Sequence, residues 1–141
     1  NYLEICQETF EICLASGVLY HSTKPVELLH NICNKCDQLI LWTHYFDKAV
    51  IRAREPEFKN RFKDSDTLEY QGESIQHYSF QYEDEASTDQ FCGGLNSGSI
   101  WLDRKGIETI LGKNNFEITA EGFDHPNHPN GPAIAIIAEK N

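Results

Sequence analysis

Two stretches decide the fold: EICLASGVL at residues 11–19 and QLILWT at residues 38–43. Both are short apolar runs with β-branched members, the pattern of strands that are covered on both faces in a parallel sheet. Between them, apolar side chains recur at the spacing of one helix face, at Leu29, Ile32, Cys33 and Cys36. Pro25 is tolerated in the first turn of that helix. A strand, a helix and a strand within about 30 residues predict a right-handed βαβ unit.

The end of the chain predicts two further strands. Residues 116–121, FEITAE, alternate apolar and polar side chains, which indicates a strand with one wet face at the edge of a sheet. Residues 133–138, AIAIIA, are apolar throughout and indicate an inner strand. The polar connection at residues 124–132 is too short for a crossover helix, so we expect the last two strands to pair antiparallel.

A second helix is predicted just before this pair. Asp103 can cap its first turn, and the helix should run through Leu111. Leu102 and Ile107 have the spacing of a hydrophobic staple across the cap. Gly112 is the predicted stop.

The middle of the chain, residues 47–92, is rich in charge and looks like an insertion. Residues 68–71 and 75–82 flank Gly72 and predict a β-hairpin with one aromatic face. That face contains Tyr78, Phe80 and Tyr82. It either packs the hairpin onto the body of the protein or stacks on a sugar as a lid. We expect residues 83–85 and 93–99 to form mobile surface.

Composition narrows the possible functions. The chain has 141 residues and a formal charge of −10, which suits one domain and disfavours general DNA or RNA binding. No apolar run approaches the ~20 residues that span a bilayer, and no signal peptide is evident. We therefore expect a cytoplasmic protein with no membrane segment. The sequence contains no Met and begins with Asn1, so we expect it to be a piece of a longer polypeptide.

The five cysteines are an odd number spread through apolar segments, which favours reduced thiols. Cys33 and Cys36 have the spacing of a metal or redox pair. Without a second such pair, the more economical interpretation is that both continue the apolar helix face as small buried side chains.

The residues of the βαβ unit are similar to those of a known family. FEICLASGVLYHSTKPVELLHNI at residues 10–32, followed by QLILWTHYF at residues 38–46, resembles strand four, the next helix and strand five of class I S-adenosylmethionine-dependent methyltransferases. Members often carry Val-Leu-Tyr-His or Val-Leu-His-His and then Asp-Pro before that helix. Here Val18 to His21 precede Lys24 and Pro25. The tail, with Trp101 and Leu102 before a helix and GPAIAIIAEK at the end, is similar to the final helix and strands six and seven of that family.

The resemblance implies an α/β fold that is the C-terminal half of a Rossmann-like methyltransferase sheet. Parallel strands would be joined by a terminal antiparallel pair, with a β-hairpin insertion or lid at residues 47–92 of a single partial domain at residues 1–141. The family's glycine-rich turn, its ribose-binding acidic residue and its adenine-contacting strand all precede this region. S-adenosylmethionine would thus bind in the complete protein, and the chain alone would be inactive.

In open α/β sheets, ligands bind beyond the carboxyl ends of the strands. The family resemblance implies that the backbone of Ala15, Ser16, Gly17 and Val18 approaches the methionine part of the cofactor. Gly17 would permit that close approach, or it is a simple bend at the end of the strand. We expect substrate-binding side chains on the same rim, at Tyr20, His44 and Tyr45.

His21 also lies on this rim, and its imidazole titrates near neutral pH. It can act as a general base toward an acceptor hydroxyl, orient the acceptor, or cap the following helix. We assign it the catalytic role and predict no metal. His125 and His128 belong either to a solvated turn or to a metal site with no third ligand that can be named.

The predicted function is methyl transfer to a small-molecule or glycan-type acceptor. One alternative is a non-catalytic acceptor-binding or protein-interaction module. Another is a small zinc-binding module that uses Cys33, Cys36, His125 and His128. Without the first half of the sheet, the first strand would be an exposed edge beside an apolar face. We therefore predict a homodimer or a swapped assembly.

Overall fold

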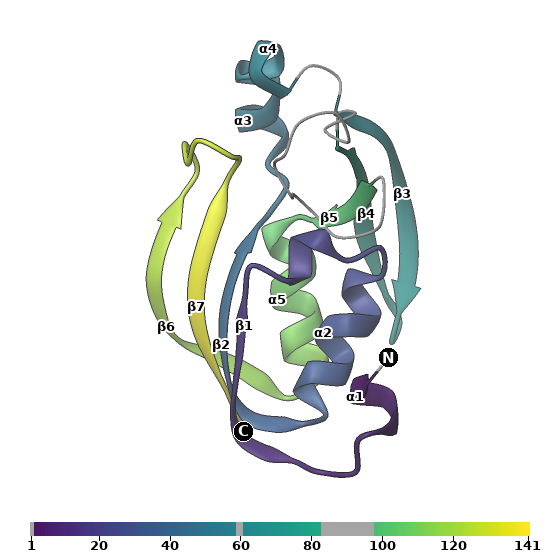
Figure 1. Ribbon diagram of the computed structural model, residues 1–141, viewed down its shortest axis with the longest axis vertical. Helices are drawn as coiled ribbons and strands as arrows, with labels where there is room; N and C mark the ends of the chain where they lie inside the picture. The colour runs from purple at the N-terminus through teal and green to yellow at the C-terminus, as the bar shows by residue number, and fades with distance from the viewer. Residues whose placement is uncertain (1, 59–60, 83–97) are drawn as a thin grey trace, which may run out of the picture.

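The computed structural model describes residues 2–58, 61–82 and 98–141, and its main feature is a four-stranded sheet (Figure 1). The strand order is β1 (Phe10–Ser16), β2 (Cys36–His44), β7 (Ala133–Lys140) and β6 (Phe116–His125). β1 and β2 are parallel, whereas β7 runs antiparallel to both of its neighbours. The predicted α/β class, the parallel pair and the terminal antiparallel pair are confirmed, with β7 inside the sheet and β6 at its edge.

Two helices pack on the same face of this sheet, which we call the covered face. They are α2 (Pro25–Cys33) and α5 (Arg104–Lys113), and they lie between the four-stranded sheet and a second, smaller sheet (Figure 1). The core beneath them is mostly apolar, with Leu29, Leu39, Leu41, Ile107 and Ile136 almost inaccessible to solvent. Side chains alternate along a strand, so the neighbours of these core residues point to the opposite face.

That opposite face, which we call the bare face, carries exposed apolar side chains. They are Phe10, Ile12, Leu14, Ile40 and Phe123. The strands bring them together, since Leu14 lies opposite Ile40 and Ile40 lies opposite Ile137 in the pairing register. The apolar pattern taken alone, which predicts that β1 is covered on both faces, is therefore wrong for this chain. The expectation of an exposed edge beside an apolar face is confirmed, because β1 is an edge strand and Leu14 is 68% exposed.

The α2 helix ends earlier than its apolar spacing indicates. It stops at Cys33, and Asn34 and Lys35 form a turn. Cys36 is buried as predicted, but it is the first residue of β2 rather than part of a helix face. In the sequence pattern, Cys36 falls where the next apolar residue of the helix face would fall. A buried strand residue and a buried helix residue therefore gave the same signal at this position.

The second sheet contains the predicted hairpin. β3 (Phe62–Tyr70) and β4 (Glu73–Gln81) pair antiparallel around Gln71 and Gly72, which both have positive φ, at 48° and 81°. This backbone suits a tight hairpin turn. A third strand, β5 (Gly98–Leu102), joins β4 and was not predicted. Residues 98 and 99, expected to be mobile, begin that strand, whereas residues 83–85 and 93–97 lie outside the described residues.

The predicted cap of α5 is confirmed. The Asp103 carboxylate accepts a hydrogen bond of 2.7 Å from the Gly106 backbone N–H, and Leu102 and Ile107 are both buried. The predicted stop is wrong, because the helix continues through Gly112 to Lys113, and Asn115 takes the left-handed conformation instead, with φ of 62°.

The remaining helices are short: α1 (Tyr2–Ile5), the 3₁₀ turn η1 (Leu19–His21), α3 (Lys48–Ala53) and α4 (Glu55–Phe58). Within the three described ranges, no helix has the length and apolar character needed to cross a membrane.

Candidate functional site

The carboxyl ends of β1 and β2 form a rim where the chain turns sharply at Gly17. Gly17 has φ of 71°, and its N–H donates a 3.0 Å hydrogen bond to the Trp42 carbonyl. A Cβ at this position would lie 3.3 Å from the Trp42 ring. A side chain is thus opposed both by the backbone conformation and by the neighbouring ring. Ala15 and Ser16 end β1 beside this turn, and Val18 leads into η1.

His21 ends η1, where the second sheet reaches the rim. Its Nδ1 lies 2.6 Å from the Tyr82 hydroxyl oxygen, and the Tyr82 hydroxyl donates a 3.2 Å hydrogen bond to Ser99 Oγ. The two rings are nearly parallel, with centroids 5.9 Å apart. Partial burial lowers the pKa of His21, so the neutral imidazole is favoured at neutral pH.

His44, the last residue of β2, is buried on the same rim. Its Nδ1–H donates to the carbonyls of Gly131 and Pro132, at 2.9 and 3.1 Å. Two carbonyl acceptors fix the proton on Nδ1, so Nε2 carries the lone pair in the neutral ring. Burial is the main cause that lowers the pKa of His44, and the neighbouring His128 and His21 act in the same direction.

Aromatic rings surround His44 and form what we call the rim cluster. Trp101 stacks on His44 with centroids 5.3 Å apart, and Tyr20, Trp42 and His128 approach it edge-on at 4.6, 5.3 and 5.0 Å. The predicted substrate-binding residues Tyr20 and His44 therefore meet in one cluster. The ring of His128 packs into that cluster, whereas residues 125–127, 129 and 130 of the connection are exposed, as expected for a solvated turn.

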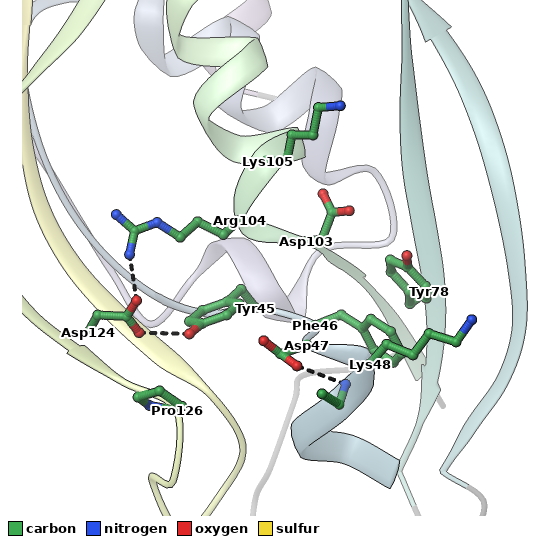
Figure 2. Close-up of a pocket in the computed structure, with 11 residues that line it drawn as sticks. Tyr45, Phe46, Asp47, Lys48, Tyr78, Asp103, Arg104, Lys105, Asp124 and Pro126 are labelled. Carbon is green, nitrogen blue, oxygen red and sulfur yellow. Dashed lines mark hydrogen bonds and ion pairs between the residues drawn. The ribbon is translucent and has the colours of Figure 1, made fainter.

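Tyr45 faces a different part of the molecule, because successive strand side chains point to opposite sides. Its hydroxyl donates a 2.7 Å hydrogen bond to Asp124 Oδ1, and Arg104 binds the other oxygen of the same carboxylate (Figure 2). These residues line a cleft of about 450 Å³, whose wall includes the stacked rings of Phe46 and Tyr78, 3.7 Å apart. Burial raises the pKa of Tyr45, so its hydroxyl stays protonated. None of the rim-cluster residues lines this cleft.

The zinc-module alternative is wrong. Cys36 begins β2 and His44 ends it, which separates them by about 26 Å, and His125 pairs near the His44 end. Burial raises the pKa of the Cys33 and Cys36 thiols to about 12 and about 11, which disfavours the thiolate that zinc requires. Among the described residues, no group of three or more His, Cys, Asp or Glu side chains is placed to hold a metal ion.

Several site residues escaped the sequence analysis. Ser99 and Trp101 lie in the unpredicted strand β5, and Gly131 acts through its backbone carbonyl. Tyr82 was predicted on an aromatic hairpin face, but its contact with His21 spans 61 positions and left no local signal. The Arg104–Asp124 pair also had no sequence signal, since both residues were interpreted only as part of a helix start and a polar connection.

Comparisons with known proteins show the fold. No protein-family model matches the sequence, and no curated protein matches it. The N-terminal domain of EvdMO1, crystallised in the presence of S-adenosylhomocysteine (SAH) and D-fucose, aligns with a TM-score of 0.54 at 20% identity, over 98% of this chain and 52% of that chain.

The chain shares its mixed α/β fold with that domain. An S-adenosylmethionine-dependent methyltransferase from Clostridium acetobutylicum aligns with a TM-score of 0.48 at 10% identity, over 96% of this chain and 60% of that chain. The glycopeptide N-methyltransferase MtfA in complex with SAH aligns with a TM-score of 0.45 at 8% identity, over 96% of this chain and 57% of that chain. The chain thus spans a little over half the length of these structures.

Proposed function

We propose that this chain is the C-terminal part of an S-adenosylmethionine-dependent methyltransferase that acts on a small-molecule or glycan-type acceptor. The observation that carries the proposal is the gathering of Gly17, His21 and His44 at the carboxyl ends of two parallel strands, in a fold shared with an SAH-bound domain. D-fucose in that related crystal supports an acceptor of the sugar type.

The residues that would hold the cofactor are Ala15, Ser16, Gly17 and Val18. They fit the methionine end of it, because the positive φ of Gly17 and the lack of a side chain leave the main chain open to close approach at the end of β1. Groups for the ribose and the adenine are expected from residues that precede Asn1, so the chain alone should bind cofactor weakly and lack activity.

When bound, S-adenosylmethionine supplies an electrophilic methyl group whose bond to sulfur breaks as a bond to the acceptor oxygen or nitrogen forms. The acceptor must lose a proton, and His21 takes it, since its lowered pKa keeps the imidazole neutral. The rim cluster would exclude water and place Tyr20 beside the acceptor, and the buried ring of His44 would support Tyr20 from within the cluster. Tyr45 would bind a more distant part of a larger acceptor through the cleft.

The test is a calorimetric titration with SAH. We would compare the polypeptide expressed from its native start codon with residues 1–141 alone. Binding to the long form and at least tenfold weaker binding to the short one is expected. No binding to the long form would overturn the proposal.

A matched pair of glycine variants sharpens this titration. Gly17→Ala in the long form should weaken SAH binding, because it forces a Cβ against Trp42 at positive φ. Gly112→Ala places a methyl group in open space on α5 and should leave binding unchanged. Equal affinities for the two variants would remove Ala15 to Val18 from the proposed site.

A second candidate is a non-catalytic acceptor-binding or protein-interaction module. The observation that favours it is the bare face, where Ile12 and Leu14 are more than half exposed. A long form that binds no SAH but forms a stable complex through this face would support it. The four described cysteines that are free, Cys6, Cys13, Cys33 and Cys36, favour a cytoplasmic location for either candidate.

A further inference from the structure

The hairpin sheet contributes a hydroxyl directly to the rim. Tyr82 immediately follows β4, and its oxygen lies between His21 Nδ1 at 2.6 Å and Ser99 Oγ at 3.2 Å. Ser99 is buried in β5, and the backbone of the same strand binds the residue after His21, since Ile100 N–H donates to the Ser22 carbonyl at 2.9 Å. The hydroxyl is therefore held against His21 by a strand that is itself anchored to the His21 turn.

The direction of these bonds decides the tautomer of His21. A tyrosine hydroxyl has one proton, and we assign that proton to the hydrogen bond with Ser99 Oγ, an oxygen that can accept it. The contact of 2.6 Å with His21 is then attractive only if His21 Nδ1 carries a hydrogen and donates it to the Tyr82 oxygen. In the neutral ring, Nε2 is left with the lone pair, and within the described residues Nε2 makes no hydrogen bond.

We propose that Tyr82, oriented by Ser99, is a positioning residue that fixes the Nδ1–H tautomer of His21 and leaves Nε2 as its proton-accepting atom. Free histidine favours the opposite tautomer, with hydrogen on Nε2, so the protein must impose this one. The part of the proposal that gives Nε2 the acceptor's proton rests on the proposed function. The tautomer itself does not.

The molecule offers an internal reference for this tautomer. His30 Nδ1 lies 2.9 Å from Asn114 Oδ1, an oxygen that only accepts, and the amide of Asn34 lies 2.9 Å from His30 Nε2. Both contacts require hydrogen on Nδ1 of His30. His30 Nδ1 also lies 2.8 Å from the Tyr70 hydroxyl. His30 therefore has the same kind of tyrosine contact as His21, but it lies away from the rim.

The experiment is long-range ¹H–¹⁵N NMR on residues 1–141 labelled with ¹⁵N-histidine, at a pH where the rings are neutral. His21 and His30 should both show protonated Nδ1 and unprotonated Nε2. In Tyr82→Phe, His21 should shift toward the Nε2–H form, because Nδ1–H has lost its acceptor. In Ser99→Ala, the Tyr82 proton is free to turn toward Nδ1 and should drive the same shift.

Tyr78→Phe is the matched control, since Tyr78 lies on β4, just before Tyr82 in the chain, but stacks on Phe46. It should leave His21 unchanged, and His30 should be unchanged in all three variants. A wild-type His21 with hydrogen on Nε2, or a Tyr82→Phe variant with the wild-type pattern, would overturn the proposal. If Tyr82→Phe does not fold, Ser99→Ala decides the same question.

Failure of this proposal and failure of the proposed function give different results. A long form that binds no SAH while His21 keeps the Nδ1–H tautomer removes the methyltransferase assignment and retains the Tyr82 assignment. SAH binding to the long form, with a His21 tautomer that does not change in Tyr82→Phe, retains the methyltransferase assignment and removes the Tyr82 assignment.

Discussion

The two faces of the four-stranded sheet have similar apolar side chains and very different surroundings. On the covered face, Leu39 and Leu41 of β2 lie under α2 and α5 and are fully buried. On the bare face, the intervening Ile40 is 36% exposed and its neighbour Leu14 is 68% exposed. Sheets with parallel strands are normally covered on both sides. The comparison shows that the apolar side chains of the covered face stabilise this chain, whereas those of the bare face remain free to pack against another segment or chain.

The largest expected effect is on the covered face. Leu41→Ala should lower the free energy of unfolding by about 2–5 kcal/mol, because it removes buried methyl groups and leaves a cavity between β2 and the helices. Ile40→Ala, one position along the same strand, should cost at most about 1 kcal/mol. Denaturant unfolding of both variants, at a protein concentration where the chain is monomeric, measures the difference. Equal losses would mean that Ile40 is covered within the monomer.

The bare face should mediate self-association, which is the next largest effect. We expect residues 1–141 to form a dimer or a swapped assembly, because β1 offers both an unpaired strand edge and the exposed side chain of Leu14. Leu14→Lys should weaken association at least tenfold, or about 1.4 kcal/mol. Sedimentation equilibrium checks this result.

The control for self-association is Glu11→Lys, which adds the same side chain at another exposed position of β1. Because side chains alternate along a strand, Glu11 and Leu14 point to opposite faces of the sheet. It should leave the dimer largely intact. A wild-type chain that is strictly monomeric at high concentration would contradict the prediction at once.

The contrast between the faces explains how far the sequence predicted the structure. Periodicity located α2, β2, β7 and β6 because their patterns reflect local burial. Periodicity alone predicted that β1 is covered on both faces, and its exposure was expected only from the family resemblance, which implies that the first half of the sheet is missing. Ser99 and Trp101 were missed for a related reason: their strand exists only through pairing with β4. The Tyr82–His21 contact depends on that same long-range pairing.

A smaller effect is expected at the cap of α5, which helps to close the covered face. Asp103→Ala should destabilise the protein by about 1 kcal/mol, because the Gly106 N–H loses its acceptor. Asp103→Asn keeps an acceptor oxygen and should recover most of that loss. Thermal unfolding of the pair is the measurement, and identical values for the two variants would show that the cap contributes little.

The smallest effect is a pH dependence at the end of β2, where aromatic rings cover the bare-face side of the strand. His44 alternates with Ile40 along the strand, yet the rings of Tyr20 and Trp101 bury it and lower its pKa below the ordinary value of 6.5. The unfolded chain therefore binds a proton at a pH where the folded chain does not. The stability that His44 contributes is complete above pH 6.5 and is lost as the pH falls toward the lowered pKa.

His44→Asn tests this sign, because an amide N–H can still donate to the Gly131 carbonyl but cannot titrate. The difference in unfolding free energy between wild type and this variant should shrink between pH 7.5 and pH 5.5. His21 and His77, whose pKa values are also lowered by burial, remain in both proteins and cancel. Leu41→Ala removes no titrating group, so the difference in unfolding free energy between this variant and wild type should stay constant between pH 7.5 and pH 5.5. A constant difference for His44→Asn as well would mean that the aromatic cover does not keep His44 neutral, and that even this end of the bare face is open to water.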